Sequence, residues 1–338
     1  MTGLKEIAAS TGLSINTVSR ALRQSGYVSA AARGKILCAA KELGYSPNRA
    51  ARSLRFRRNF EIVVVGLLHG NELYCDALNM SKIIGMKKRV ATSGYELNLN
   101  FAFANSTFCK KTASFMEDVL KENPAGLIIM GESPQCVAMA KACRKQQIPV
   151  VLISSGEIPG CDCVYIDRAQ GVCDAVDYLA ANGRQHIAFV GSLSCGNRMR
   201  GYTEGIKKNH LKEHIVEWGY AHESIGGIFT IGVNAARAII TEHKEVDAIQ
   251  AYSDYLAAGL VAGFVEAGKN VPRDIAVIGF DNRELASFTS PPLTTVAQPN
   301  VQVGELCIDL VLKKIENKEI DRPLAVKVPM TLAIRGSA

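Results

Sequence analysis

Seven short apolar runs recur beyond Phe60, and longer helical stretches separate them. The runs are Ile62–Leu68, Leu97–Phe103, Gly126–Met130, Pro149–Ile153, Ile187–Val190, Ala248–Ala251 and Ile275–Gly279. Continuous rather than alternating apolar strands are typical of parallel sheets that helices cover on both faces. The pattern therefore predicts a doubly wound α/β body, and its length suits two lobes with a cleft between them.

The first sixty residues carry almost all of the net charge. Between Met1 and Phe60, eleven Lys and Arg residues face two acidic ones, a net charge of +9, whereas the rest of the chain has 28 basic and 30 acidic residues, a net charge of −2. A strongly basic small segment joined to a nearly neutral body indicates that the segment binds a polyanion, for which the whole-chain charge of +7 alone would be weak evidence.

The composition excludes several other classes of protein. The ten cysteines include no CxxC pair, and no His lies near Cys161, Cys163 and Cys173, so buried reduced thiols are a better interpretation than disulfides or zinc. No apolar run is long enough to span a membrane, and the N-terminus has no apolar signal segment, so we expect a cytoplasmic protein. Nucleotide-binding glycine motifs, a nucleophile elbow, HExxH and a triad-like His setting are all absent from the sequence, so we expect neither an enzyme nor a cofactor or metal.

Three helices are predicted in the basic segment. The first spans Leu4–Ser10, and Gly12 provides the backbone freedom that a tight turn needs. Ser14 is suited to cap the second helix, and the third runs from its Ser29 cap to Leu43. The residues of the third helix expected to face the core are Ile36, Leu37, Ala40 and Leu43.

The second helix is predicted to have an apolar and a polar face. The inner face has Val18, Ala21 and Leu22, and the outer face has Ile15, Asn16, Ser19, Arg20 and Arg23. An amide and a guanidinium can pair with base edges, and isoleucine methyls can meet a thymine methyl. The hydroxyls of Ser14 and Thr17 can donate to phosphates beside the helix N-terminus. The alternative is a solvated polar face of an ordinary three-helix bundle.

A short basic helix is predicted after Pro47. Asn48 can cap residues 49–55, on which Arg52 and Arg55 share one face while Leu54 lies on another. One to two helical turns are not stable alone in water, so we expect a partner to order this helix. Leu54 is suited to insert between base steps in a minor groove.

Several motifs of the chain occur together in one known family. They are EIAASTGLS at 6–14, TVSR at 17–20, VS at 28–29, LGYSPN at 43–48 and ARSL at 51–54, followed in the body by RMRGY at 198–202, GFDN at 279–282 and PPLTTVAQP at 291–299. In combination they resemble the LacI family of bacterial transcription regulators across essentially the whole chain. The resemblance implies that Ile15, Asn16 and Arg20 read bases and that Leu54 is the minor-groove lever.

Polar residues at strand ends point to a small-molecule site in the body. Arg198 and Asp281 lie in or just after such ends, where open α/β sheets bind ligands, and a carboxylate with a planar guanidinium suits a polyol or sugar. A surface ion pair for Arg198 and a helix cap for Asp281 are the alternatives. Asp254 directly precedes a helix and is either a ligand contact or a cap.

The family resemblance adds four candidates for contact with the effector. Asn71 and Tyr74 lie in a segment, NELY, that is similar to the family's NPFF segment, and Tyr74 either stacks on a ring or fills the core. Ser154 stands where many sugar-responsive members have an Asp, and Phe229 lies near Gly227, where an aromatic residue is common. These two departures leave an unusual sugar, a nucleoside and a modified amino sugar open as ligands.

These observations predict a DNA-binding transcription regulator, most simply a repressor. We expect a helix-turn-helix headpiece at 1–46, a hinge at 47–59, an N-terminal lobe at 60–164 and 298–325, and a C-terminal lobe at 165–297 and 326–338. A homodimer, or a tetramer formed from two dimers, would bind double-stranded DNA at a pseudo-palindromic operator, and a small molecule between the lobes would control the affinity. A solute receptor without DNA binding and a co-repressed regulator that responds to a nucleoside-like ligand are the alternatives.

Overall fold

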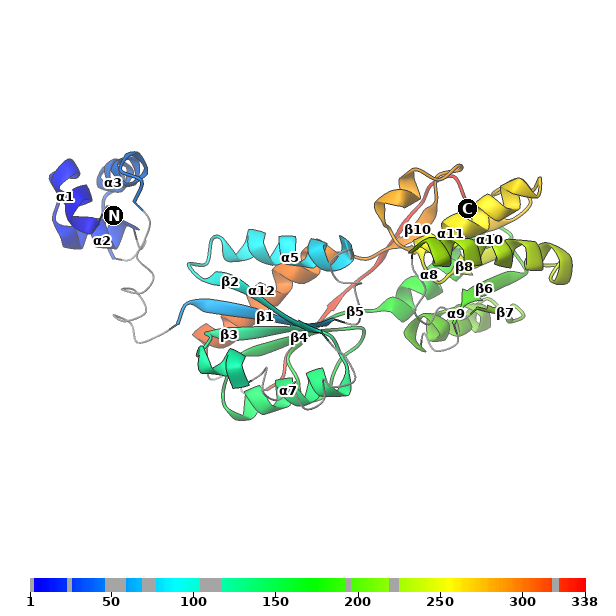
Figure 1. Ribbon diagram of the computed structural model, residues 1–338, viewed down its shortest axis with the longest axis horizontal. Coiled ribbons are helices and arrows are strands. Elements are labelled where there is room, and N and C mark those ends of the chain that lie inside the picture. Colours follow the sequence, from blue (N-terminus) through cyan, green and yellow to red (C-terminus); the bar gives the residue numbers. More distant parts are fainter. Residues whose placement is uncertain are drawn as a thin grey trace. The chain divides into compact units, whose positions relative to one another are not determined.

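The computed structural model describes residues 3–22, 26–45, 59–68, 77–103, 117–192, 196–218, 225–317 and 322–338. The chain divides into two compact units, Met1–Asn59 and Phe60–Ala338 (Figure 1). Each unit has its own apolar core.

The described part of the first unit contains the helices α1 (Leu4–Thr11), α2 (Ile15–Leu22) and α3 (Ala30–Glu42). Gly12 has a φ of 69°, a left-handed conformation that glycine adopts without strain, and this allows the tight turn between α1 and α2. Ile7, Val18 and Ile36, one from each helix, are fully buried in a single apolar cluster. The predicted three-helix headpiece is therefore present.

For the third helix, the prediction of which residues face the core is wrong at two positions. Ile36 and Ala40 are buried, together with Ala39, but Leu37 is 51 % exposed and Leu43 is 38 % exposed. Leu37 is one residue, about 100°, around the helix from Ile36, and Leu43 follows the last helical residue, so neither continues the buried stripe.

The second unit contains two six-stranded sheets. The first has the order β11-β5-β4-β3-β1-β2 with all of its strands parallel. The second has the order β12-β10-β9-β8-β6-β7, parallel except at β12. The strands are β1 (Glu61–Leu68), β2 (Glu96–Phe103), β3 (Gly126–Met130), β4 (Val150–Ser154), β5 (Cys163–Ile166), β6 (Ile187–Gly191), β7 (His214–Glu217), β8 (Ala248–Ala251), β9 (Ala276–Asp281), β10 (Thr294–Ala297), β11 (Ala325–Val328) and β12 (Thr331–Ala333).

The antiparallel edge strand β12 departs from the expected pair of fully parallel sheets. It pairs with β10 in the opposite direction. Only two residues separate it from β11, which belongs to the other sheet, and the chain runs between the sheets as one extended segment (Figure 1, red). Because β11 and β12 form one extended segment, β12 keeps the direction of β11, and this direction is antiparallel to β10.

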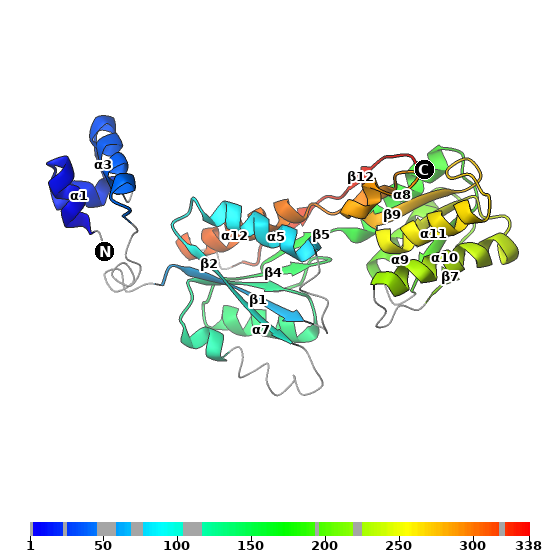
Figure 2. The same cartoon turned by 45° about the horizontal axis from the view of Figure 1, so that its top comes forward.

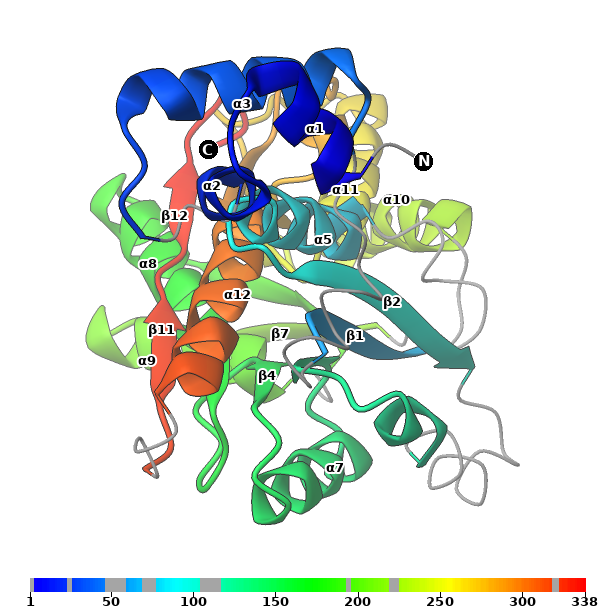
Figure 3. The same ribbon diagram turned by 90° about the vertical axis from the view of Figure 1, so that its left-hand side faces the viewer.

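Helices cover both faces of each sheet, as the continuous apolar strands predicted. In the first sheet Ile62 and Val64 pack in one cluster with α5 (Ala77–Val90) and α12 (Asn300–Glu316), whereas Val63 and Val65 pack in another with α7 (Pro134–Lys145). Figures 2 and 3 show α5 and α12 on one side of this sheet and α7 on the other.

The second sheet follows the same rule. Ile187 and Phe189 of β6 pack with α8 (Arg168–Ala181) and α9 (Gly196–Lys208), and the alternate residues Ala188 and Val190 pack with α10 (Ile225–Glu242) and α11 (Asp254–Glu266). A short 3-10 helix, η2 (Glu284–Ser287), follows β9.

Two of the expected lobe boundaries fall inside strands. The boundary at 164/165 cuts β5 and that at 325/326 cuts β11, and both strands belong to the first sheet. We therefore propose that the chain changes lobe after Ile166 and after Val328, with the third change directly after Ala297 at the end of β10.

The cysteines near residue 160 are packing residues. Cys161 and Cys163 are buried in the apolar cluster that also contains Cys136 and Cys143, and burial raises the pKa of Cys143 to about 11. Within the described ranges no group of three or more His, Cys, Asp or Glu residues is placed to hold a metal ion. No helix in the described part of the chain has the length and apolar character needed to cross a membrane.

Candidate DNA-binding and effector sites

Helix α2 begins with the cap that its sequence predicted. The Ser14 hydroxyl oxygen accepts a hydrogen bond from the Thr17 backbone N–H at 3.1 Å, and the two hydroxyls lie 2.8 Å apart. Both residues are at the N-terminal end of the helix, where backbone N–H groups and the helix dipole favour an anion.

The outward face of α2 presents chemistry that suits base recognition. Asn16 and Arg20 are exposed and Ile15 is 45 % exposed, although an isoleucine normally lies in a core. Ser19 was expected on this face but is only 6 % exposed. It lies one residue, about 100°, around the helix from buried Val18, and its small side chain is covered at the flank of the helix.

Five of the expected DNA contacts lie outside the described residues. They are Arg23, Asn48, Arg52, Leu54 and Arg55. One exposed residue of the headpiece was missed by the sequence analysis: Tyr27 follows α2 and is 91 % exposed, so its phenol is accessible to a phosphate.

In the second unit, Arg198 of α9 is held rigidly between two aromatic rings. Its guanidinium carbon lies 4.1 Å from the centroid of the Tyr252 ring and 4.1 Å from that of the Phe280 ring. One terminal nitrogen, Nη1, donates to the backbone oxygen of Tyr252 at 2.6 Å, and Nη2 lies 3.6 Å from Oδ1 of Asp281. The structure thus brings Arg198 and Asp281 together near the carboxyl ends of β6, β8 and β9, and their contact with a ligand stays a prediction.

Asp281 is the last residue of β9 and has a strained backbone. Its φ of 116° is in a region that side-chain-bearing residues rarely adopt, and such strain persists only where surrounding contacts enforce it. Its carboxylate accepts hydrogen bonds from the Gln298 amide and from Nε of Arg283. The Asp281 carboxylate is thus contacted by Arg198, Arg283 and Gln298, which come from three segments of the chain.

Asp254 does not reach the surface, and its partners are Thr295 and the backbone of Arg283. It is fully buried, its Oδ1 accepts from the Thr295 hydroxyl at 2.5 Å, and its Oδ2 accepts from the backbone N–H of Arg283 at 2.6 Å. Burial raises its pKa to about 7. The helix cap is the neighbouring Ser253, whose hydroxyl accepts from the Leu256 N–H. We therefore assign Asp254 as a positioning residue rather than a ligand contact.

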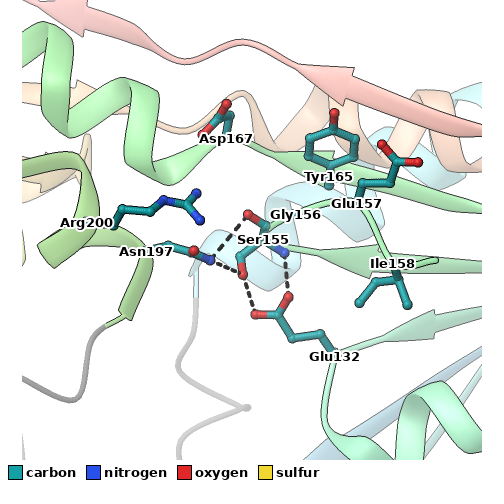
Figure 4. Close-up of a pocket in the computed structure, with 9 residues that line it drawn as sticks. All are labelled: Glu132, Ser155, Gly156, Glu157, Ile158, Tyr165, Asp167, Asn197 and Arg200. Carbon is teal, nitrogen blue, oxygen red and sulfur yellow. Dashed lines mark hydrogen bonds between the residues drawn. The ribbon is translucent and has the colours of Figure 1, made fainter. Parts of the chain in front are cut away.

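A hydrogen-bonded chain of three side chains joins the two lobes (Figure 4). Glu132, after β3, accepts from the N–H of Ser155 at 2.7 Å and from its hydroxyl at 2.5 Å. Asn197 of α9 donates its amide to the Ser155 hydroxyl at 2.6 Å. We call Glu132, Ser155 and Asn197 the interlobe latch.

The latch forms one wall of a polar pocket of about 410 Å³. Besides the latch the pocket is lined by Gly156, Glu157, Ile158, Tyr165, Asp167 and Arg200. Asn197 and Arg200 lie about one turn apart on α9, and neither Arg198 nor Asp281 is among the residues that line this pocket. The sequence analysis named no latch residue, although Ser155 directly follows Ser154 and Asn197 precedes Arg198.

Two further candidates, Ser154 and Phe229, lie in the described part of the chain. Ser154 is buried and its hydroxyl donates to the Gly156 backbone oxygen at 2.7 Å, which fixes the turn after β4. Phe229 of α10 is 41 % exposed. Asn71 and Tyr74 lie outside the described residues.

These features define a DNA-binding regulator with a helix-turn-helix headpiece and a two-lobed, periplasmic-binding-protein-like body. Residues 3–48 match the family model of the bacterial regulatory proteins of the lacI family, and residues 176–338 match that of a periplasmic binding protein-like domain. The chain belongs to the LacI family of bacterial transcription regulators.

Similar proteins align along nearly the whole chain. The ribose operon repressor of Escherichia coli is 28 % identical over 100 % of both chains. The HTH-type transcriptional repressor PurR of Photobacterium profundum is 27 % identical over 95 % of this chain and 94 % of its own. A crystal structure of the Lac repressor dimer bound to operator and the anti-inducer ONPF shares the fold, with a TM-score of 0.71 and 24 % identity over 99 % of this chain and 98 % of that one.

Proposed function

We propose that this regulator is a repressor whose dimer binds a pseudo-palindromic operator and whose affinity is set by a small molecule held between the lobes. The exposed Asn16 and Arg20 on a helix capped by Ser14 carry the DNA-binding part of the proposal. In this arrangement α2 lies in the major groove, Ile15, Asn16 and Arg20 contact base edges, and Ser14 and Thr17 contact phosphates.

The hinge is part of the same proposal. Asn48, Arg52, Leu54 and Arg55 form a short helix only when DNA and the second protomer are present, and Leu54 enters the minor groove there. Arg23 adds a further contact to the backbone. Because the operator is chromosomal DNA, the proposed place of action is the cytoplasm, and no catalytic activity is assigned.

An apolar surface on the N-terminal lobe supports the dimer. Met80 and Ile84 lie one turn apart on α5 and are 47 % and 57 % exposed, and Val301 at the start of the adjoining α12 is 40 % exposed. Large apolar side chains gathered on one exposed helix face are typical of a protein interface. Two copies related by a twofold axis would cover this surface and bring their headpieces to neighbouring half-sites.

The effector is proposed to be a sugar or a related metabolite, held by Arg198 and Asp281 with Asn71, Tyr74 and Phe229 around it. A solved relative is a complex with cellobiose, and two others have bound ribose, which supports this ligand class. Closure of the lobes on the ligand makes or breaks the interlobe latch, and this changes the spacing of the two hinges in the dimer. A coupling of about 1 to 3 kcal/mol between cleft and operator is typical of such systems.

A mobility-shift titration of the full chain against genomic fragments tests the DNA-binding part. We expect a specific complex that is lost when residues 1–60 are deleted, and a specific complex that survives the deletion would contradict the proposal. A thermal-shift screen with sugars, nucleosides and phosphorylated metabolites tests the effector part, because a ligand that binds only the folded body raises its melting temperature.

A further inference from the structure

Arg20, the residue of α2 proposed to read a base, has its side chain supported by the backbone of Gly26. A Cβ atom at position 26 would lie 3.5 Å from Cδ, 3.9 Å from Nε and 4.0 Å from Cγ of Arg20. Arg20 as a whole is exposed. Its aliphatic stem therefore packs along the Gly26 backbone while much of the side chain stays accessible to DNA.

The segment that follows Gly26 is anchored to the folded headpiece. Val28 packs against the apolar cluster of the three helices, and the Ser29 hydroxyl oxygen accepts from the Ala32 N–H at 3.3 Å as the cap of α3. Gly26 itself has a φ of 67°, a left-handed backbone that glycine adopts without strain. The surface that supports Arg20 is thus part of the headpiece fold.

A supported stem matters for base recognition by an arginine. The side chain has many rotamers, and ordering them on DNA costs binding free energy. Bidentate recognition of a guanine also needs the planar guanidinium at one position and one angle. A surface that restricts the stem before DNA binds therefore favours the matching base. Glycine allows this close approach because it has no side chain in the space beside the stem.

We propose that Gly26 is a positioning residue for base recognition, and that its bare backbone directs the Arg20 side chain toward one base pair of each half-site. The inference rests on the proposed function, since it concerns how Arg20 of the same DNA-binding face reaches its base. The alternative is a purely structural role, in which the glycine is needed only for the left-handed turn.

The test compares the full-length wild type with Gly26→Ala, Gly26→Asn and the control Gly44→Asn. Ala adds only the Cβ, at an ordinary contact distance from the Arg20 stem, but it strains a left-handed backbone. Asn tolerates this backbone better and adds an amide beyond the Cβ, in the space beside the stem. Gly44 has a φ of 58°, and nothing in the described ranges lies within 4 Å of its Cβ position, so Gly44→Asn makes the same change without meeting Arg20.

Base preference is measured by selection from double-stranded DNA randomised over about 20 base pairs, the length of two half-sites, and Arg20→Ala marks the base pair that depends on Arg20. At this base pair we expect Gly26→Asn to lose about fivefold to hundredfold of the wild-type preference, whereas Gly26→Ala and Gly44→Asn should keep it.

Amide hydrogen exchange in α3 measures the stability of the headpiece in the same full-length proteins. It should be fastest in Gly26→Ala, because Ala is the more strained of the two residues at a left-handed position. Stability should then fall most in Gly26→Ala and base preference most in Gly26→Asn. A purely structural role cannot produce these opposite orders.

Three results would overturn the inference. They are an unchanged base preference in Gly26→Asn, the same change of preference in Gly44→Asn, and a loss of preference in Gly26→Ala that follows its faster exchange. If Arg20→Ala changes the preference at one base pair while Gly26→Asn does not, the inference fails and the proposed function stands. If the wild type selects no sequence, or Arg20→Ala changes no preference, the proposed role of α2 fails and the inference fails with it.

Discussion

Replacing Asp254 with Asn should change how the stability of the C-terminal lobe depends on pH. Asp254 is fully buried, and burial raises its pKa from 3.8 to about 7. The folded state therefore holds the proton more tightly than the unfolded state, so the stabilisation is complete below the unfolded pKa and is lost as the pH rises through the folded pKa. Asn has the same shape as the protonated acid, can accept from the Arg283 N–H and can donate to the Thr295 hydroxyl.

The size of the effect follows from the difference between the two pKa values. Each pH unit between them corresponds to somewhat more than ~1 kcal/mol, so the wild type should lose about 3 kcal/mol of unfolding free energy from this group between pH 5 and pH 8. The Asn variant has no titrating group at this position and should not lose it. The variant should be similar to the wild type at pH 5 and more stable by about 2 to 3 kcal/mol at pH 8.

Urea unfolding followed by tryptophan fluorescence measures this difference in the C-terminal lobe, which contains Asp254. The chain has a single tryptophan, Trp218, which packs against the apolar cluster that contains the core of α11. The wild type and the variant differ only at residue 254, so the comparison isolates the contribution of this position. Asp274→Asn is the matched control, because the Asp274 carboxylate is bound by the Asn270 N–H and by Arg273, its pKa is lowered, and it is already ionised at pH 5. Parallel stability curves for the wild type and Asp254→Asn would refute the reasoning.

Three further changes test the packing, the DNA face and the latch. Tyr202→Phe should lower the unfolding free energy by about 1 to 3 kcal/mol in the same urea assay. The reason is that the buried hydroxyl accepts from the His214 N–H at 2.8 Å and donates to the Ile187 backbone oxygen at 2.9 Å. An unchanged urea midpoint would contradict this. Arg20→Ala should weaken operator binding by about 1 to 3 kcal/mol and relax the base preference at one operator position. Fluorescence anisotropy with operator variants measures both effects. The control Lys41→Ala on α3 should leave every base preference unchanged. Asn197→Ala removes the amide of the interlobe latch, worth about 0.5 to 1.5 kcal/mol, and should speed amide hydrogen exchange in residues 155–158. The control Asn209→Ala removes an amide that donates to Asp177 of α8 just after the opposite end of α9, and should leave that segment unchanged. Equal exchange in both variants would count against the latch.

The sequence predicted the regular parts of the fold because they depend on local patterns. The seven short apolar runs correspond to β1, β2, β3, β4, β6, β8 and β9, and the residue types alone predicted the cap at Ser14 and the turn at Gly12. The sequence did not predict the other strands, β5, β7, β10, β11 and β12, which have three or four residues like β8 and whose pairing depends on chain segments far away. The antiparallel direction of β12 follows from the two-residue connection to a strand of the other sheet.

For the DNA-binding and effector sites too, some features follow from the sequence and others only from the structure. By itself the sequence determined that a basic helix-turn-helix segment precedes a two-lobed α/β body, that α2 presents Ile15, Asn16 and Arg20, and that Arg198 and Asp281 lie at strand ends, because composition, caps and motifs are local properties. Only the tertiary structure decided that Asp254 is buried and bonded to Thr295 and the backbone of Arg283, and that Glu132, Ser155 and Asn197 join the lobes. Burial, pairing and charge balance are set by residues that are distant in sequence and meet only when the chain has folded.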